Sequence, residues 1–134
     1  MKEIQKIYRS AKYALKGLRH AYSADKSFRM EVNYGLPIYL GVAWYLAPFQ
    51  PWEILLYTFS YLFILIVELV NTAFEKVLDR LHPEEHELIG RSKDIASAAV
   101  LMAFFFAVLV VVALFSVRIH SNVITPIPFQ LPYA

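Results

Sequence analysis

The chain has 134 residues, enough for one domain, and 58% of them are hydrophobic. Its mean hydropathy of +0.46 is high for a soluble globular protein. The formal net charge is +2 and cysteine is absent, which excludes disulfides and thiolate metal sites. Eight of the lysines and arginines lie within the first 31 residues, against three acidic residues. A basic arm on a hydrophobic chain favours an anionic membrane surface over nucleic acid as its partner.

Residues 1–30 are predicted to form an amphipathic helix on the membrane surface. Apolar side chains recur at three- and four-residue spacing, as in Ile4, Ile7, Ala11 and Leu15, and basic residues fall largely between them. A signal peptide is the competing interpretation. It is excluded because charges interrupt the apolar residues every few positions, so the segment has no continuous apolar core.

Three transmembrane helices are predicted over residues 36–51, 52–76 and 96–117, in an all-α membrane protein. The third is uncharged and long enough to span a bilayer, which takes about 20 residues. The first is uncharged but short, and Pro48 and Pro51 predict a turn after it. Basic residues lie in the N-terminal arm and between the second and third spans, which predicts that both face the cytoplasm. Residues 121–134 contain three prolines and are predicted to be an irregular tail.

A polar stripe interrupts the second predicted span, in the stretch VELVNTAFEKVLD. Glu68, Asn71, Glu75 and Asp79 follow one another at spacings of three, four and four residues, so their directions on a helix agree within roughly 80°. If Lys76 marks the membrane boundary, Glu68 lies about 12 Å inside it. A charge at the centre of a bilayer costs about 2.5–3.5 kcal/mol on insertion scales, so this stripe is not expected to face lipid. It faces either a neighbouring helix, as a hydrogen-bonded seam, or a polar pocket or cation.

More polar groups converge on the cytoplasmic end of the third span, where Lys93 and Asp94 precede Ser97. Carboxylates bind Mg²⁺, lysine neutralises phosphate oxygens, and a buried carboxylate can act as a general base. Together these groups fit phosphoryl transfer at a membrane surface. The segment His82-Pro83-Glu84-Glu85-His86 matches a zinc-peptidase pattern, but the proline excludes the single continuous helix that this pattern requires. No glycine-rich phosphate-binding loop is present in the sequence.

Three stretches, LKGLRHAY....FRME, ELVNTAFEKVLDR and HELIGRSKDIASAAVL, resemble those of the small integral-membrane prokaryotic diacylglycerol kinases. That family includes the undecaprenol kinases. The resemblance extends from about residue 6 to residue 117 and is closer to the diacylglycerol kinases of Gram-negative bacteria. It implies a homotrimer in the bacterial inner membrane, with active sites shared between neighbouring chains. The reaction that it implies moves the γ-phosphoryl group of ATP to a lipid hydroxyl on the cytoplasmic side.

The resemblance also implies a role for individual residues. Glu68 would be the general base, Asp25 and Glu75 would hold Mg²⁺, and Asn71 and Asp79 would support the phosphates. The residues implied in ATP binding are Lys6, Tyr13, Asp25, Glu75, Glu84, Glu85, His86, Lys93 and Asp94. Those implied in lipid binding are Arg19, Glu31, Glu68 and Ser97. The sequence departs from the family pattern in Asp25, where many members have glutamate, and in Lys6, where some have arginine.

Simpler roles remain open for several of these side chains. Lys6 and Arg19 would also serve as headgroup anchors, Tyr13 as an interfacial residue and Ser97 as a packing residue, and Glu85 and His86 would suit a solvated loop. Undecaprenol is the alternative lipid substrate. A rival from another class is a non-catalytic membrane subunit with a carboxylate relay. That rival needs carboxylates spread through the bilayer, whereas apart from Glu53 they crowd one boundary.

Overall fold

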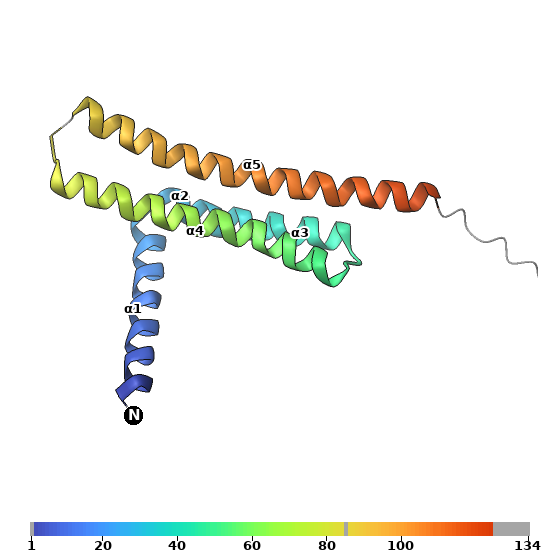
Figure 1. Cartoon of the computed structure of the whole chain (residues 1–134), viewed down its shortest axis with the longest axis horizontal. Coiled ribbons are helices and arrows are strands. Elements are labelled where there is room, and N and C mark those ends of the chain that lie inside the picture. Colours follow the sequence, from blue (N-terminus) through green and yellow to red (C-terminus); the bar gives the residue numbers. More distant parts are fainter. Residues whose placement is uncertain (1, 85, 125–134) are drawn as a thin grey trace, which may run out of the picture.

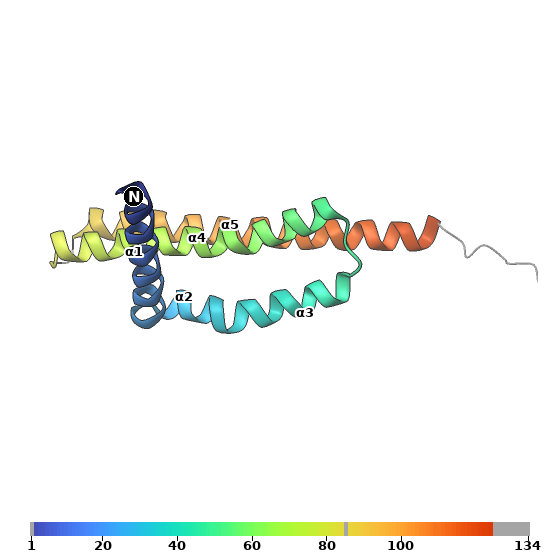
Figure 2. The ribbon, with the colours of Figure 1, turned by 90° about the horizontal axis from the view of Figure 1, so that it is seen from below.

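The structure is a computed structural model that describes residues 2–84 and 86–124. Within these ranges the chain is helical and contains no strand, as predicted. The elements are α1 (Lys2–Ala24), α2 (Lys26–Met30), the π-helical turn η1 (Glu31–Gly35), α3 (Leu36–Leu46), α4 (Pro51–Leu81) and α5 (Glu87–Ile124). Helices α4 and α5 run side by side, α3 lies along α4, and α1 projects crosswise from this bundle (Figures 1 and 2).

The N-terminal helix ends earlier than the sequence suggested. The helix predicted over residues 1–30 divides at Asp25, whose extended backbone (φ −106°, ψ 126°) and side chain cap α2 by accepting a hydrogen bond from the Phe28 amide at 2.8 Å. Arg29 then donates to the backbone oxygens of Tyr22 and Ser23, which close α1. Residues 26–30 therefore belong to the bundle, where Phe28 is buried, and α1 is exposed almost throughout.

The predicted membrane helices also differ in their bounds. Two helices, Pro51–Leu81 and Glu87–His120, are long and apolar enough to cross a membrane on length and composition, and they contain the second and third predicted spans. The first predicted span is shorter than expected, since α3 ends at Leu46, but α2, η1 and α3 form a continuous helical run over residues 26–46. Helix α5 continues through residues 121–124 of the predicted irregular tail, and residues 125–134 lie outside the described part of the chain.

The buried apolar core is small and lies where α3, α4 and α5 meet. It consists of Leu46, Tyr57, Val110 and Leu114. Many other large apolar side chains face outward, including Leu101 and Trp44, which are 70% and 84% exposed. An apolar surface of this extent indicates contact with lipid or with other protein chains.

An ion pair connects the helices at the end of the bundle where this core lies. Arg118 of α5 donates to both carboxylate oxygens of Glu53 on α4, at 2.9 and 2.8 Å. It also donates to the backbone oxygen of Leu46, the last residue of α3, at 3.0 Å and to that of Pro48 at 2.7 Å. Glu53 is 1% exposed and accepts a further bond from the Gln50 amide that caps α4. One guanidinium thus joins the ends of all three helices.

We expect Arg118→Met to lower the free energy of unfolding by about 3 kcal/mol, because it leaves the buried Glu53 carboxylate without its counter-charge. The control is Arg91→Met, which breaks the exposed α5 ion pair with Glu87 and should cost about 0.5 kcal/mol or less. Thermal unfolding of both variants in the same detergent measures the difference. Equal losses would show that the pair between Arg118 and Glu53 does not fasten the bundle.

Candidate functional site

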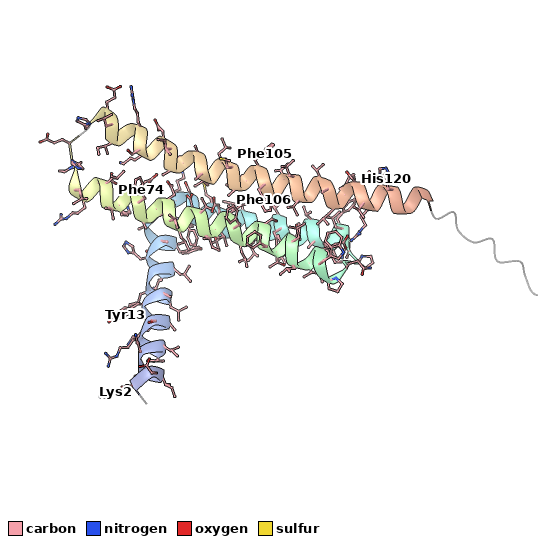
Figure 3. The ribbon with its side chains drawn as sticks, viewed as in Figure 1. Lys2, Tyr13, Phe74, Phe105, Phe106 and His120 are labelled. Carbon is pink, nitrogen blue, oxygen red and sulfur yellow. The ribbon has the colours of Figure 1, made fainter. Side chains whose placement is uncertain are left out.

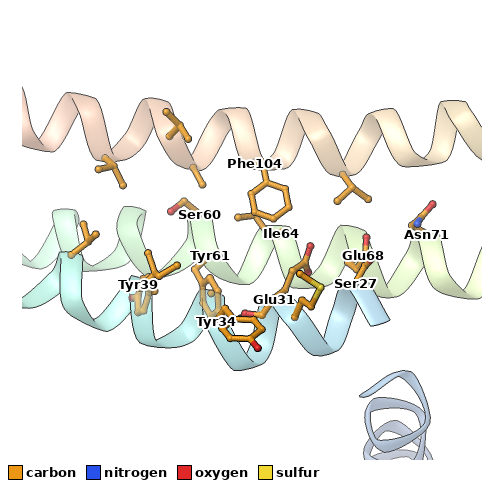
Figure 4. Close-up of a pocket in the computed structure, with 18 of the residues that line it drawn as sticks. Ser27, Glu31, Tyr34, Tyr39, Ser60, Tyr61, Ile64, Glu68, Asn71 and Phe104 are labelled. Carbon is orange, nitrogen blue, oxygen red and sulfur yellow. The ribbon is translucent and has the colours of Figure 1, made fainter. Parts of the chain in front are cut away.

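A groove of about 750 Å³ runs between the α2–α3 run, α4 and α5 (Figure 4). One end is polar and is lined by Asp25, Ser27, Glu31, Glu68, Asn71, Glu75 and Ser97. The other end is apolar and is lined by Val42, Val108, Val111 and Val112. We call the set Asp25, Glu31, Glu68 and Glu75 the carboxylate cluster.

Helix α4 supplies the centre of the polar end. The spacing of three and four residues puts Glu68, Asn71 and Glu75 on one face, and all three line the groove, as the stripe predicted. Glu68 is 3% exposed and lies at the junction with the apolar part. Asp79 continues the stripe but does not line the groove. It instead forms an ion pair with Lys93 that joins α4 to α5.

The helical run on the other wall supplies the remaining carboxylates. Asp25 is the N-cap residue of α2. Glu31 directly follows α2 and is the first residue of the π-helical turn η1. Helical turns of this wide type are often found at functional sites. Glu31 repels both Glu68 and Asp25, and Glu68 repels Asp25 and Glu75. The fold therefore brings four carboxylates to one end of the groove from segments that are far apart in the sequence.

The cluster has no basic counter-charge among the described residues that line the groove. Two acceptor oxygens, Glu31 Oε2 and Asn71 Oδ1, are buried without a hydrogen-bond partner. The Asn71 side-chain NH₂ group donates to Glu75 Oε1 at 3.2 Å, whereas the Asn71 Oδ1 atom does not take part in this hydrogen bond. Repelling carboxylates and an unpaired amide oxygen are the ligand types that Mg²⁺ takes in proteins.

These groups fit a cation that is shared with a substrate. Within residues 2–84 and 86–124, no three acidic or histidine side chains converge closely enough to hold a metal ion alone. Mg²⁺ is commonly bound by one or two carboxylates together with substrate phosphates. The seam alternative fits only the outer end of the stripe, where Asp79 pairs with Lys93 of α5, because the hydrogen bond from Asn71 to Glu75 runs along α4 and not between helices.

Other predicted site residues lie away from the groove of this chain. Lys6, Tyr13 and Arg19 are exposed on α1, and Figure 3 shows Tyr13 on that projecting helix. Glu84 and His86 lie in the connection between α4 and α5, where His86 Nδ1 accepts a hydrogen bond from the Leu88 amide. Asp94 is exposed on α5, and Glu85 lies outside the described residues. Their assignment to nucleotide or lipid stays a prediction.

The groove also has an aromatic wall that was not predicted from the sequence. Tyr39 from α3 and Tyr57 and Tyr61 from α4 line its middle, and Ser60 lies between the last two. The only available signal was the four-residue spacing of Tyr57 and Tyr61, which puts them on one helix face. That face is also the face of Glu68, seven residues after Tyr61.

Comparison with known proteins identifies relatives of this chain. A family model described as prokaryotic diacylglycerol kinase matches residues 12–115. The diacylglycerol kinase of Escherichia coli strain K12 is 42% identical over 106 residues, which cover 78% of this chain and 84% of that protein. The diacylglycerol kinase of Haemophilus influenzae is 38% identical over 97 residues, covering 72% and 80%. That of Helicobacter pylori strain 26695 is 28% identical over 109 residues, covering 81% and 84%.

Asp25 has a capping role that is separable from its charge. We expect Asp25→Asn to leave the stability nearly unchanged, because asparagine caps a helix as well as aspartate does, whereas Asp25→Ala should cost about 1 kcal/mol. Thermal unfolding of the two variants beside Ser27→Ala, which alters the same end of the groove without removing the cap, measures the effect. If asparagine and alanine destabilise equally, the cap is not what Asp25 contributes to the fold.

Proposed function

The chain belongs to the prokaryotic diacylglycerol kinase family and is a kinase that acts on diacylglycerol, and we propose that its groove is the site of phosphoryl transfer. In this proposal the γ-phosphoryl group of ATP passes to the free hydroxyl of 1,2-diacylglycerol and gives phosphatidic acid. The observation that carries it is the position of Glu68, buried where the carboxylate cluster meets the apolar groove. The names of the relatives favour diacylglycerol over undecaprenol.

The two ends of the groove suit the two parts of the lipid. A diacylglycerol carries one hydroxyl beside two hydrocarbon chains, so the hydroxyl fits at the polar end and a chain fits among Val42, Val108 and Val111. Ser97 on α5 and Glu31 lie on opposite sides of the polar end and offer hydrogen bonds to the glycerol. This orientation brings the hydroxyl to Glu68.

Glu68 acts in this proposal as the general base. It takes the proton of the lipid hydroxyl as the hydroxyl oxygen bonds to the γ-phosphorus, and the bond from that phosphorus to the bridging oxygen breaks to leave ADP. Burial removes water that would compete for the carboxylate.

Asp25 and Glu75 are the proposed ligands of Mg²⁺, with Asn71 Oδ1 as a third oxygen nearby. The ion would neutralise the negative charge of the phosphates. Lys93, held by Asp79 at the same end of α4, would bind phosphate oxygens, and Asp94, Glu84, Glu85 and His86 would surround the nucleotide.

Since the described lining of the groove lacks lysine and arginine, we propose that a neighbouring chain supplies further groups. Lys6, Tyr13 and Arg19 lie exposed on α1, which projects away from its own bundle (Figure 1) and is free to reach a second chain. This arrangement is a homotrimer with shared sites, as the resemblance implied. The broad exposed apolar faces of α4 and α5 support contacts between chains as well as with lipid.

The long apolar helices and the family both indicate a membrane protein. We propose three spans in the bacterial inner membrane, with the site on the cytoplasmic side. The helical run over residues 26–46 supports the first predicted span, because 21 helical residues extend about 30 Å, which is the thickness of the hydrocarbon core.

The Glu68→Gln variant tests the proposed base. It keeps the side-chain shape but cannot take a proton, so turnover of diacylglycerol with ATP and Mg²⁺ should fall by about two orders of magnitude or more. Thermal stability of the same preparation should change little. Glu87→Gln, an exposed carboxylate outside the groove, is the matched control and should keep its turnover. If the Glu68→Gln variant kept near-normal turnover, Glu68 would not be the general base, whether or not the stability of the protein had changed.

The topology is tested separately with reporter fusions. A reporter inserted at Gly90 should be cytoplasmic and one fused after Ala134 should be extracytoplasmic, because basic residues concentrate before the first span and between the second and third. Alkaline phosphatase and green fluorescent protein fusions report opposite sides. If both positions report the same side, the three-span arrangement is wrong.

A further inference from the structure

Three tyrosine rings stack against one another in the wall of the groove. The Tyr39 ring of α3 lies between two rings of α4, with its centroid 4.4 Å from that of Tyr57 and 4.9 Å from that of Tyr61. The planes are tilted by 13° and 21°. We call these three side chains the tyrosine stack, and all three line the groove (Figure 4 labels Tyr39 and Tyr61).

Hydrogen bonds hold each ring of the tyrosine stack in place. The Tyr57 hydroxyl donates to the Tyr39 backbone oxygen at 2.8 Å, and the Tyr39 hydroxyl bonds to Thr58 Oγ1 at 2.9 Å. The Tyr61 hydroxyl donates to the Glu31 backbone oxygen at 3.1 Å. Because every hydroxyl already has a partner, no ring can swing out of the wall without breaking a hydrogen bond.

The Tyr61 ring also packs closely against the backbone at Gly35. A Cβ atom added at Gly35 would lie 3.3 Å from the Tyr61 ring, closer than an ordinary van der Waals contact. Gly35 therefore lets the Tyr61 ring pack closely against the backbone at the end of η1. The tyrosine stack is therefore a fixed flat wall in the middle of the groove.

The stack lies where the hydrocarbon of a bound lipid must pass. Tyr61 and Tyr57 precede Glu68 by seven and eleven residues on the same helix, which is roughly 10 and 16 Å along its axis. A lipid whose hydroxyl lies at Glu68 therefore meets the rings along the middle of a chain and not at its glycerol. Phe104 of α5 lines the groove as well.

We propose that the tyrosine stack selects the hydrocarbon of the lipid substrate, admitting unbranched acyl chains and rejecting methyl-branched ones. The inference rests on the proposed function, since it takes Glu68 as the position of the reacting hydroxyl. An unbranched chain lies flat along fixed rings, whereas each methyl branch needs space that a rigid wall does not give. Replacing a ring by a smaller apolar side chain creates that space.

The test compares two substrates with the same glycerol, 1,2-dioleoylglycerol and the methyl-branched 1,2-diphytanoylglycerol, in mixed micelles with ATP and Mg²⁺. Wild-type protein should have a kcat/KM at least about tenfold higher for the unbranched lipid. In Tyr39→Leu and Tyr61→Leu this ratio should fall by about tenfold, while Tyr39→Phe and Tyr61→Phe, which keep the rings, should retain most of it. Tyr45→Leu is the control, because Tyr45 is an exposed tyrosine of α3 outside the groove.

The outcomes separate the two proposals. Equal use of both lipids by wild-type protein would overturn the role of the tyrosine stack, whether or not the leucine variants fold. An unchanged ratio in folded Tyr39→Leu and Tyr61→Leu proteins would overturn it too. In both cases dioleoylglycerol would still be phosphorylated, and the proposed function would stand. A different result would contradict the proposed function, namely that the Glu68→Gln variant phosphorylates dioleoylglycerol as fast as the wild-type protein.

Discussion

Charged side chains cannot face hydrocarbon without a large cost, and this constraint governs the arrangement of the whole bundle. Helix α4 carries Glu68, Asn71 and Glu75 among apolar residues, so that face must be turned away from lipid. The α2–α3 run and α5 flank it and form the groove that receives all three side chains. The position of α3 and the existence of a substrate groove therefore have the same physical origin.

The two ends of the bundle satisfy that constraint in opposite ways. At one end Glu53 is paired with Arg118 on both of its oxygens, and the charge is neutralised within the protein. At the other end the carboxylate cluster has no such partner among the described groove residues. A paired carboxylate holds helices together, whereas unpaired carboxylates beside a groove remain available for a cation and a proton. We infer that the first end supports the fold and the second performs the reaction.

The helical content and the α4 stripe could be predicted from the sequence, because hydrophobic runs and a 3.6-residue period are local properties. Asp25 and Glu31 were assigned to the site only through family resemblance, since their approach to Glu68 depends on how the chain breaks at Asp25. The Arg118–Glu53 pair and the tyrosine stack were missed because their partners lie 65 and about 20 positions apart. The length of α3 was misjudged because Pro48 and Pro51 marked a turn without fixing where the helix before it ends.

The central claim is that a diacylglycerol lies along the groove with its hydroxyl at Glu68 and a chain beside the tyrosine stack. Photoreactive diacylglycerols test it most directly, one with the reactive group next to the ester and one with it near the end of the chain. The first should label peptides around Ser27–Glu31 and Glu68, and the second those around Tyr57–Ile64 and Val108–Val112. Labelling by both probes of only the outward-facing residues of α5, such as Leu101 and Phe105, would contradict the account.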